Sequence, residues 1–436
     1  PDAMQSFKPA QMAALPPQAL AGMEAEQIRV LPPTAARALN PEQVGALPPQ
    51  AMAAIPPGVF KAFSTAAIAA LTPEQRNALP PQALNPPPLP QPATAGNIGA
   101  LVNSLSGWNI DKVPPAAFTG MRPTDVAKLP ADAFTALSPN QFTALPPAAF
   151  TGLRPNQVEL LPPDAMAAMK PTQLGQLPPN AFAALSPAQV GALPPAALAG
   201  MKPTQTGQLP PEAFEVMKPN QVGALPPAAV SGLKPAQISV LPPEAMTAMK
   251  PNQVGALKPT AVAALEPEQI AALPPTALTQ MKPTQAAALP IDAIAELKPT
   301  QVAALPPAAV SGLKPDQVSA LPPEAMTAMK PNQVAALKPA AMAGLEPEQI
   351  DALPASALRQ VSDKQLGAIP PDAMKSLDKA QINALPTEAF KGMKPDQANA
   401  LSPDQARAMQ PADVAQMPPA VRTIVNNLKA QPPAGA

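Results

Sequence analysis

The sequence predicts an all-α protein, an α-solenoid of very short helices with one helix in each eight-residue repeat. Three observations lead to this prediction. Proline recurs on an eight-residue spacing, as in "LPPEAMTAMKPNQVGAL" at residues 241–257, and the residues between the prolines are good helix formers. Leucine or methionine recurs at every eighth residue from Met121 to Met417, with Val361 and Ile369 as the only replacements. Aromatic residues make up only 3% of the chain, which disfavours strands.

The repeat, called the octad below, has the pattern x-Pro-x-[Gln/Ala]-φ-x-[Ala/Gly]-[Leu/Met], in which φ is apolar. Proline is disfavoured inside a helix but fits its first position, and it pushes the preceding residue out of the helical conformation. Each x-Pro step therefore ends one helix and begins the next. Pro, φ and Leu/Met are three residues apart and form one stripe. Because so short a helix is unstable alone, we expect the octads to stack.

Octads of two kinds alternate. From Ala133 to Gln397, position four is alternately Ala and Gln; Ala octads usually begin Pro-Pro, whereas Gln octads usually begin with Lys, Ser or Glu before Pro. We therefore predict that octads pair into 16-residue coils, with Ala octads on one side and Gln octads on the other. A spiral with three or four octads per turn is the competing shape. Buried glutamines need partners, so we expect a ladder of glutamine hydrogen bonds between coils.

The pattern divides the chain into four parts. Residues 1–84 (the first octad block) and residues 113–425 (the second octad block) are separated by residues 85–112, across which the register shifts by two. We interpret 85–112 as a Pro-rich linker or plug with a short helix at "NIGALVNSL"; a partner-docking site or a Pro-rich recognition ligand are the alternatives. Residues 426–436 are predicted to form a tail. Since Pro1 takes position two of an octad, we expect the chain to be a piece of something longer.

The composition bears on chemistry. The 436 residues include 71 prolines, about three times the average usage, and no Cys or His. The commonest general base and the usual zinc ligands are therefore missing, and no nucleotide-binding loop, EF-hand or nucleophile elbow is present. The 29 basic residues balance 29 acidic ones, which does not indicate a nucleic-acid partner. We predict no enzyme activity, no catalytic, cofactor-binding or metal-binding residues, no cofactor and no small-molecule substrate.

The outer surface points to association instead. Charged residues make up 13% of the chain, and in Ala octads such as "PPAAVSGL" even the outward positions are Pro, Ala, Ser or Gly. Wide flanks of apolar or small residues favour association, and a uniform repeat favours open, filament-like contacts. We therefore expect self-association into a homopolymer. No run of apolar residues is long enough for a membrane span.

The octads "SPAQVGAL", "KPTQVAAL", "TPEQRNAL" and "EPEQIAAL" resemble the octapeptide arrays, of the type x-[T/S/P]-x-Q-φ-x-A-L, in very long bacterial surface and secreted proteins described as adhesin- or haemagglutinin-like. The likeness covers nearly the whole chain outside residues 85–112. Here Pro largely replaces the Thr or Ser of that pattern, and alternate octads carry Ala for Gln. The resemblance implies an extracellular or cell-surface location, a spacer or fibre role with a cell-surface anchor outside this sequence, and no active site.

The sequence thus predicts a non-enzymatic structural repeat protein that forms or extends an extracellular filament, sheath or surface fibre. One alternative is a monomeric rod-like spacer of a larger adhesin. Another is an intracellular repeat scaffold that binds a peptide. Disorder is the third, and the unbroken register disfavours it because disorder needs no fixed spacing.

Overall fold

A computed structural model describes residues 2–5 and 7–431 of the chain. This described part is helical throughout and contains no strand. A typical octad forms a helix of four to six residues, such as α36 (Pro323–Met326) and α37 (Pro331–Ala336). The predicted all-α solenoid of very short helices, one per octad, is confirmed. The predicted position of Pro1 in an octad, and the end of the predicted tail at 432–436, lie outside the described residues.

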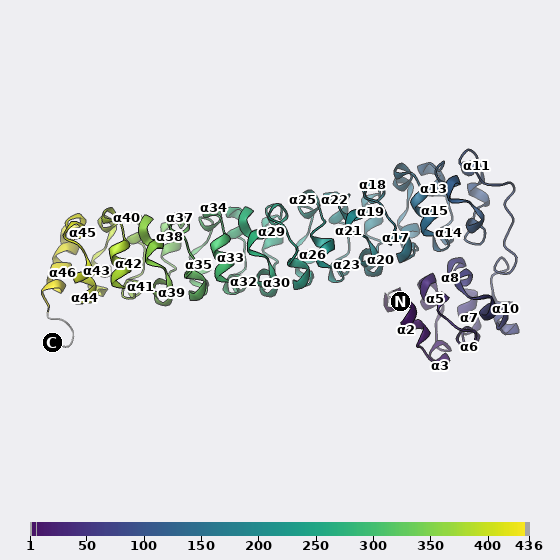
Figure 1. Cartoon of the computed structure of the whole chain (residues 1–436), viewed down its shortest axis with the longest axis horizontal. Coiled ribbons are helices and arrows are strands. Elements are labelled where there is room, and N and C mark those ends of the chain that lie inside the picture. The colour runs from purple at the N-terminus through teal and green to yellow at the C-terminus, as the bar shows by residue number, and fades with distance from the viewer. Residues whose placement is uncertain (1, 6, 432–436) are drawn as a thin grey trace. The chain divides into compact units, whose positions relative to one another are not determined.

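The chain divides into two compact units, residues 1–232 and 233–436. In the second unit, the helices follow one another along a single stack from α26 to α46 (Figure 1). The labels α and η denote α-helices and short 3-10 helices. The first unit contains α1 (Asp2–Gln5), α2 (Pro9–Ala13), α3 (Pro17–Leu20), α4 (Ala25–Arg29), α5 (Pro33–Arg37), α6 (Pro41–Gly45), α7 (Pro49–Ala53), α8 (Pro57–Ala62), α9 (Thr65–Ala69), α10 (Pro73–Ala78), α11 (Ile98–Leu101), η1 (Val102–Ser104), η2 (Ile110–Lys112), α12 (Pro115–Phe118), α13 (Pro123–Lys128), α14 (Ala131–Thr135), α15 (Pro139–Ala144), η3 (Pro147–Gly152), α16 (Pro155–Val158), α17 (Pro163–Ala167), α18 (Pro171–Leu174), α19 (Pro179–Phe182), α20 (Pro187–Ala192), α21 (Pro195–Leu198), α22 (Pro203–Thr206), α23 (Glu212–Glu215), α24 (Pro219–Val222) and α25 (Pro227–Val230). The second unit contains α26 (Pro235–Ser239), α27 (Pro243–Met246), α28 (Pro251–Val254), α29 (Pro259–Val262), α30 (Pro267–Ala272), η4 (Pro275–Gln280), α31 (Pro283–Ala286), α32 (Ile291–Ala295), α33 (Pro299–Ala304), α34 (Pro307–Val310), α35 (Pro315–Ser319), α36 (Pro323–Met326), α37 (Pro331–Ala336), α38 (Pro339–Met342), α39 (Pro347–Ala352), η5 (Ala355–Gln360), α40 (Asp363–Leu366), α41 (Pro371–Met374), α42 (Lys379–Ala384), η6 (Thr387–Gly392), α43 (Pro395–Ala400), α44 (Pro403–Ala408), α45 (Pro411–Gln416) and α46 (Pro419–Ala430).

The helix α37 shows how one octad folds. Lys330 precedes the proline and is extended, with φ −95° and ψ 156°, because proline disfavours the helical conformation of the residue before it. Pro331 then takes the first helical position, where no N–H is needed. Leu337 is extended again, with φ −59° and ψ 131°, and ends the helix. The prolines therefore separate helices without interrupting any, as the sequence predicted.

Helices pack on the helix three octads further along the chain. For example, α7 begins at Pro49 and contacts α10, which begins at Pro73, 24 residues later. In the second unit α34 and α37 pack in the same way, from Pro307 to Pro331. Because three is an odd number, each Gln octad packs on an Ala octad. The prediction of 16-residue coils with like octads on one side is therefore wrong, and the competing spiral is nearer to the observed packing.

The core of each stack is the predicted apolar stripe. In the octad of α36, Ala325, Met326 and Met329 are exposed by 0%, 1% and 3%. These residues hold positions four, five and eight, so all three point into the stack. Complete burial at position four explains why only a small Ala, or a Gln with internal partners, stands there.

Residues 85–112 differ from the predicted linker. The expected helix at "NIGALVNSL" forms as α11 followed by η1. "TAGNIGAL" at 94–101 and "SGWNIDKV" at 106–113 lie in the stack as octads that lack proline and carry Asn in place of Gln. Their apolar residues are buried, with Ile98 and Ile110 both 0% exposed. The stack of the second octad block therefore begins about twenty residues before the predicted boundary at 113, counted in whole octads.

The C-terminal tail also begins later than predicted. Residues 426–430 belong to α46, a 12-residue helix that ends at Ala430. Val421 and Val425 on this helix are completely buried, against α43, α44 and α45. The helix therefore covers the last octads, which is the role of a capping element at the end of a solenoid.

Candidate functional site

The glutamine at position four makes the most regular polar contact of the molecule. Its Nε2 donates to backbone carbonyls 28 to 31 residues earlier, as when Nε2 of Gln333 donates to the oxygens of Val302 and Leu305 at 2.7 and 2.8 Å. Gln333 is 1% exposed, so its amide depends on these partners. The predicted glutamine ladder is confirmed, and each rung joins an octad to the fourth octad before it.

The same side chain also caps its own helix. Oε1 of Gln333 accepts a hydrogen bond from the backbone N–H of Lys330 at 2.9 Å, which satisfies a donor at the start of the helix. Glutamine alone meets both needs, because Glu and Asp lack the donor and Asn is one carbon shorter. The ladder therefore fixes the residue type at position four rather than merely its polarity.

The second role explains the alternation in sequence. In Ala octads the first residue is usually proline, as at Pro322 before α36, and proline has no N–H to be capped. Without that donor, an acceptor at position four has nothing to receive, and buried Ala suffices. The 16-residue period of the sequence thus reflects two ways of starting a helix, not the size of a coil.

Rungs of this kind occur in both units. The members share the donor Nε2, an acceptor at position eight of the earlier octad and N···O distances of 2.7 to 3.0 Å to that acceptor. They are Gln43, Gln75, Gln141, Gln157, Gln173, Gln189, Gln205 and Gln221 in the first unit, and Gln269, Gln285, Gln301, Gln317, Gln333, Gln349, Gln365, Gln381, Gln397 and Gln405 in the second.

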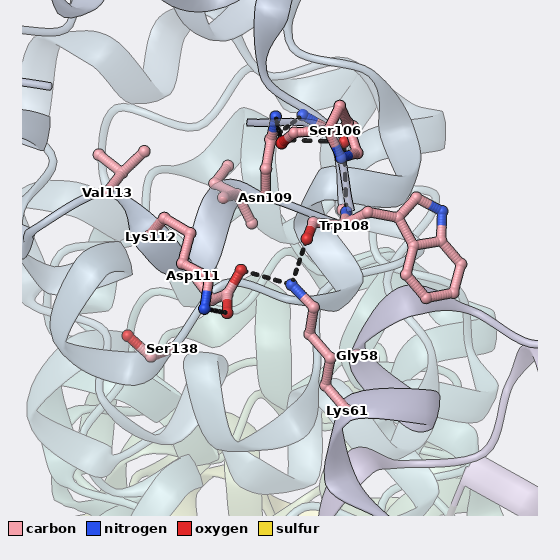
Figure 2. Close-up of polar contacts among 12 residues, drawn as sticks. Gly58, Lys61, Ser106, Trp108, Asn109, Asp111, Lys112, Val113 and Ser138 are labelled. Atoms are coloured by element: carbon pink, nitrogen blue, oxygen red, sulfur yellow. Dashed lines mark hydrogen bonds and ion pairs between the residues drawn. The ribbon is translucent and has the colours of Figure 1, made fainter. Parts of the chain in front are cut away.

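A second site joins the first octad block to the start of the second. Nζ of Lys61, on α8, donates to the backbone oxygen of Trp108 at 2.8 Å and pairs with the carboxylate of Asp111 (Figure 2). The ring of Phe60 meets the ring of Trp108 edge to face, with centroids 5.9 Å apart. Trp108 is only 6% exposed. The predicted plug is thus a contact surface within the first unit, and its aromatic part is a favourable pair.

Two glycines make this contact possible. A Cβ on Gly58 would lie 1.8 Å from the backbone oxygen of Thr135, and the Gly58 N–H donates to Oγ1 of Thr135 at 3.3 Å. A Cβ on Gly107 would lie 2.4 Å from Cγ of Pro57. Neither distance is possible for a real Cβ, so α8 and its neighbours approach this closely only because both residues lack side chains. Neither glycine is distinguished by the sequence pattern.

Asp125 stands at position four in the second octad block, where other octads of its kind carry Gln. Its Oδ2 accepts from the backbone N–H of Arg122 at 3.0 Å and from Nε of the same residue at 3.0 Å. The hydrogen bond from the Arg122 side chain holds the pKa of the Asp125 carboxyl below its ordinary value, although burial opposes the change. Asp125 thus keeps the capping role of Gln but cannot donate to an earlier octad.

The described residues offer little space for a bound molecule. In the first unit a cavity of ≈ 60 Å³ is lined by Arg29, Glu159, Ser186 and Gln189, among others. Small-molecule sites usually measure about 300–1,000 Å³. Among residues 2–5 and 7–431, no group of three or more acidic, His or Cys side chains lies together in a way that could hold a metal ion. In the same residues, no helix is both long and apolar enough to cross a membrane.

Comparison with known proteins adds no identity to these contacts. No protein-family model matches the chain, and no curated protein matches it.

Sequence reasoning found the ladder but missed several of its members. Asn97 and Asn109 cap Thr94 and Ser106 as Gln does elsewhere, with Oδ1 accepting the backbone N–H at 2.7 and 2.8 Å. The signal was present, because each Asn is followed by Ile as Gln is followed by φ. The absence of proline concealed it.

Proposed function

We propose that this protein has a non-enzymatic structural role, in which it forms or extends an extracellular filament, sheath or surface fibre by stacking octads and by lateral self-association. The observation that carries the proposal is the glutamine ladder. Every rung ties an octad to backbone atoms 28 to 31 residues earlier, so that a unit is held along its length by many equivalent contacts. A stack held in this way supports load-bearing or spacing roles and needs no ligand.

The contact between the octad blocks supports the lateral part of the proposal. Within the first unit, α8 of the first block packs beside α14 of the second block. The Gly58–Thr135 approach brings the two backbones together without large apolar side chains. Octad surfaces of small residues can therefore pack side by side, which is the contact that a fibre of several chains requires.

The proposed extracellular location rests on the resemblance of octads such as "KPTQVAAL" to the arrays of bacterial surface proteins. Labelling intact producing cells with a membrane-impermeant lysine reagent tests it. We expect the lysines before the prolines to be labelled in intact cells as they are in a lysate. Labelling restricted to the lysate would place the protein inside the cell and contradict the proposal.

Negative-stain electron microscopy of the purified chain tests the assembly. Long ordered polymers of regular width are the expected result. Isolated particles over a wide range of concentrations and salt would contradict lateral self-association, because a contact made by repeated small-residue faces should strengthen with concentration.

A monomeric spacer is the second candidate, and one observation favours it. Among the described residues, only three large apolar side chains are exposed: Leu84 at 46%, Val216 at 42% and Ile291 at 49%. Protein interfaces usually bury a core of large apolar or aromatic side chains. Isolated particles in the micrographs, together with surface labelling of intact cells, would support this spacer role.

A further inference from the structure

A stack held by a glutamine ladder has two chemically different ends. At its starting end, the position-four amides of the first turn have no earlier octad to donate to. At its finishing end, the carbonyls at positions five, six and eight of the last turn receive no later glutamine. A starting end therefore offers donors and a finishing end offers acceptors, and each should be closed by the opposite chemistry.

Both finishing ends are closed by arginine. At the end of the first octad block, Nη2 of Arg76 donates to Ile68 and Ala69 at 3.1 and 3.0 Å, and its Nε donates to Leu71 at 3.2 Å. These carbonyls hold positions five, six and eight of the preceding octad, which are the acceptors of a ladder rung.

The finishing end of the second octad block repeats this arrangement. Nη2 of Arg422 donates to Ala415 and Met417, at 2.8 and 3.1 Å, which hold positions six and eight of their octad. Nζ of Lys429 donates to the position-eight oxygen of Met409 at 2.8 Å. Arg76 and Arg422 both reach back five and seven residues, so the same device closes two ends far apart in sequence.

The starting end of the second octad block is closed by the Pro-rich segment. Nδ2 of Asn109 donates to the oxygens of Pro87 and Ser104 at 3.3 and 2.8 Å. Nδ2 of Asn97 donates to the oxygen of Pro92 at 3.0 Å. Since proline has a carbonyl but no N–H, a proline-rich strip accepts hydrogen bonds without adding donors of its own. This is the chemistry that a starting end requires.

The starting end of the first octad block has no such cover. Oε1 of Gln11 and of Gln27 accepts from its helix start at 2.9 and 2.8 Å, but no described residue accepts from the Nε2 of either. Position four is exposed at Gln11 and Ala19 and half-buried at Gln27, whereas Ala35, the next in line, is 0% exposed. Phe7 and Leu15, at position eight, are only partly buried. Polar and apolar groups of one whole turn are therefore uncovered together.

We propose that this uncovered turn, residues 7–31, is a docking surface for the finishing end of another octad stack that lacks an arginine cap. The occupant continues an interface that the chain already forms many times, with carbonyls at positions five, six and eight facing the Nε2 of Gln11 and Gln27. A second copy of this chain does not fit, because Arg76 and the α46 cap occupy its finishing ends. The surface lies beyond the fibre role proposed above and does not depend on lateral association.

The first test supplies such a partner from the protein itself. A chain that ends at Met417 lacks α46 and presents bare carbonyls. Mixed with the full chain in a sedimentation-velocity experiment, it should form end-to-end complexes, and alone it should form linear polymers. The full chain with Gln11→Leu and Gln27→Leu should bind the shortened chain at least tenfold more weakly. Gln18→Leu is the matched control, an exposed position-three glutamine of the same turn, and should leave binding unchanged.

Two outcomes of this test overturn the proposal. Binding that is insensitive to the Gln11 and Gln27 substitutions would mean that the bare apolar end, not the ladder, holds the complex. Head-to-tail polymers of the full chain alone would make a second copy the occupant. A lateral assembly of the full chain affects neither result, because the Gln11 and Gln27 comparison measures only the end contact.

A second variant keeps the test decisive if the shortened chain does not fold. A copy of residues 242–273, which are four complete octads, followed by one lysine, is placed in register ahead of Pro1. Hydrogen exchange of the amides in α2 and α4 should then slow at least tenfold. The same extension with its glutamines replaced by leucine should give much less protection. Unchanged exchange in the first extension would overturn the proposal.

Discussion

The stack of the second unit and the contact around Trp108 in the first unit are held in different ways. In the stack, each rung is one of many equivalent rungs, and its acceptors are backbone carbonyls that every octad provides. At the Trp108 contact, single residues without equivalents elsewhere decide the fit: Gly58, Gly107 and Lys61. Cohesion along the stack is therefore distributed, whereas cohesion between octad segments depends on a few positions. Substitutions should reveal this difference.

The largest effect is expected at Gly58. In Gly58→Ala, the new Cβ cannot lie 1.8 Å from the Thr135 oxygen, so α8 should separate from α14 although Ala is the better helix former. The only tryptophan of the chain, Trp108, then loses its contact with Phe60, and its fluorescence should shift to longer wavelength. Gly45→Ala is the matched control, since its Cβ would have 3.8 Å to the nearest atom. An unshifted Gly58→Ala spectrum would contradict the importance of this approach.

The next largest effect is expected within the ladder. Gln333→Leu removes two donated hydrogen bonds and the cap of Lys330, and leaves buried carbonyls unpaired, which should destabilise the protein by about 2–4 kcal/mol. The urea midpoint should fall accordingly, with protection from hydrogen exchange lost first around α33 and α37. Gln360→Leu, at an exposed position seven of the same unit, should change the midpoint little. Equal effects of the two substitutions would argue against the ladder.

A smaller effect is expected at Lys61. Lys61→Met removes the donor to the Trp108 oxygen and the ion pair with Asp111, whose side chain is 37% exposed. Such partly exposed pairs contribute about 1 kcal/mol or less, and salt reduces the contribution. The denaturant midpoint followed by Trp108 fluorescence should therefore fall slightly at low salt and still less at high salt. Lys112→Met is the control, because its Nζ lies 3.6 Å from Asp111 on a 65% exposed side chain.

The smallest effect concerns pH at Asp125. Its pKa is lower in the folded chain than in the unfolded one, so its stabilising effect is fully present above the ordinary aspartate value of about 3.9 and is lost as pH falls through the folded pKa. Asp125→Asn should remove that acid-dependent loss while keeping an acceptor for the Arg122 N–H. Urea midpoints measured between neutral pH and pH 3 in both proteins check this. Parallel pH profiles would contradict it.

The fold could be predicted because local rules decide most of it. The x-Pro step fixes where each helix ends and begins, as at Lys330 and Pro331, and the buried positions follow from the spacing of Met326 and Met329. The size of a turn could not be predicted, because the alternation that suggested 16 residues comes from capping chemistry. How far the chain turns at each corner depends on side chains meeting across three octads.

The two contact sites differ in the same respect. The ladder was predictable because glutamine recurs at position four, and a buried amide must have partners. The Trp108 contact was not, since nothing in "PPGVFKAF" shows that Gly58 meets Thr135, 77 residues away. The arginine caps were equally hidden. Arg76 occupies the φ position of "TPEQRNAL", where it reads as a departure from the pattern rather than as the end of a stack.

The backbone acceptors of the ladder have a consequence for how such a chain changes in length. Gln397 donates to Leu366 and Ile369 in an octad that carries Gln, and Gln405 donates to Met374 and Leu377 in one that carries Ala. The rung does not distinguish between them, since it contacts no side chain of the earlier octad. Unequal recombination can therefore insert or delete any whole number of octads and leave every remaining rung a partner. The near-identical segments at 226–259 and 306–339, ten octads apart, fit such a history.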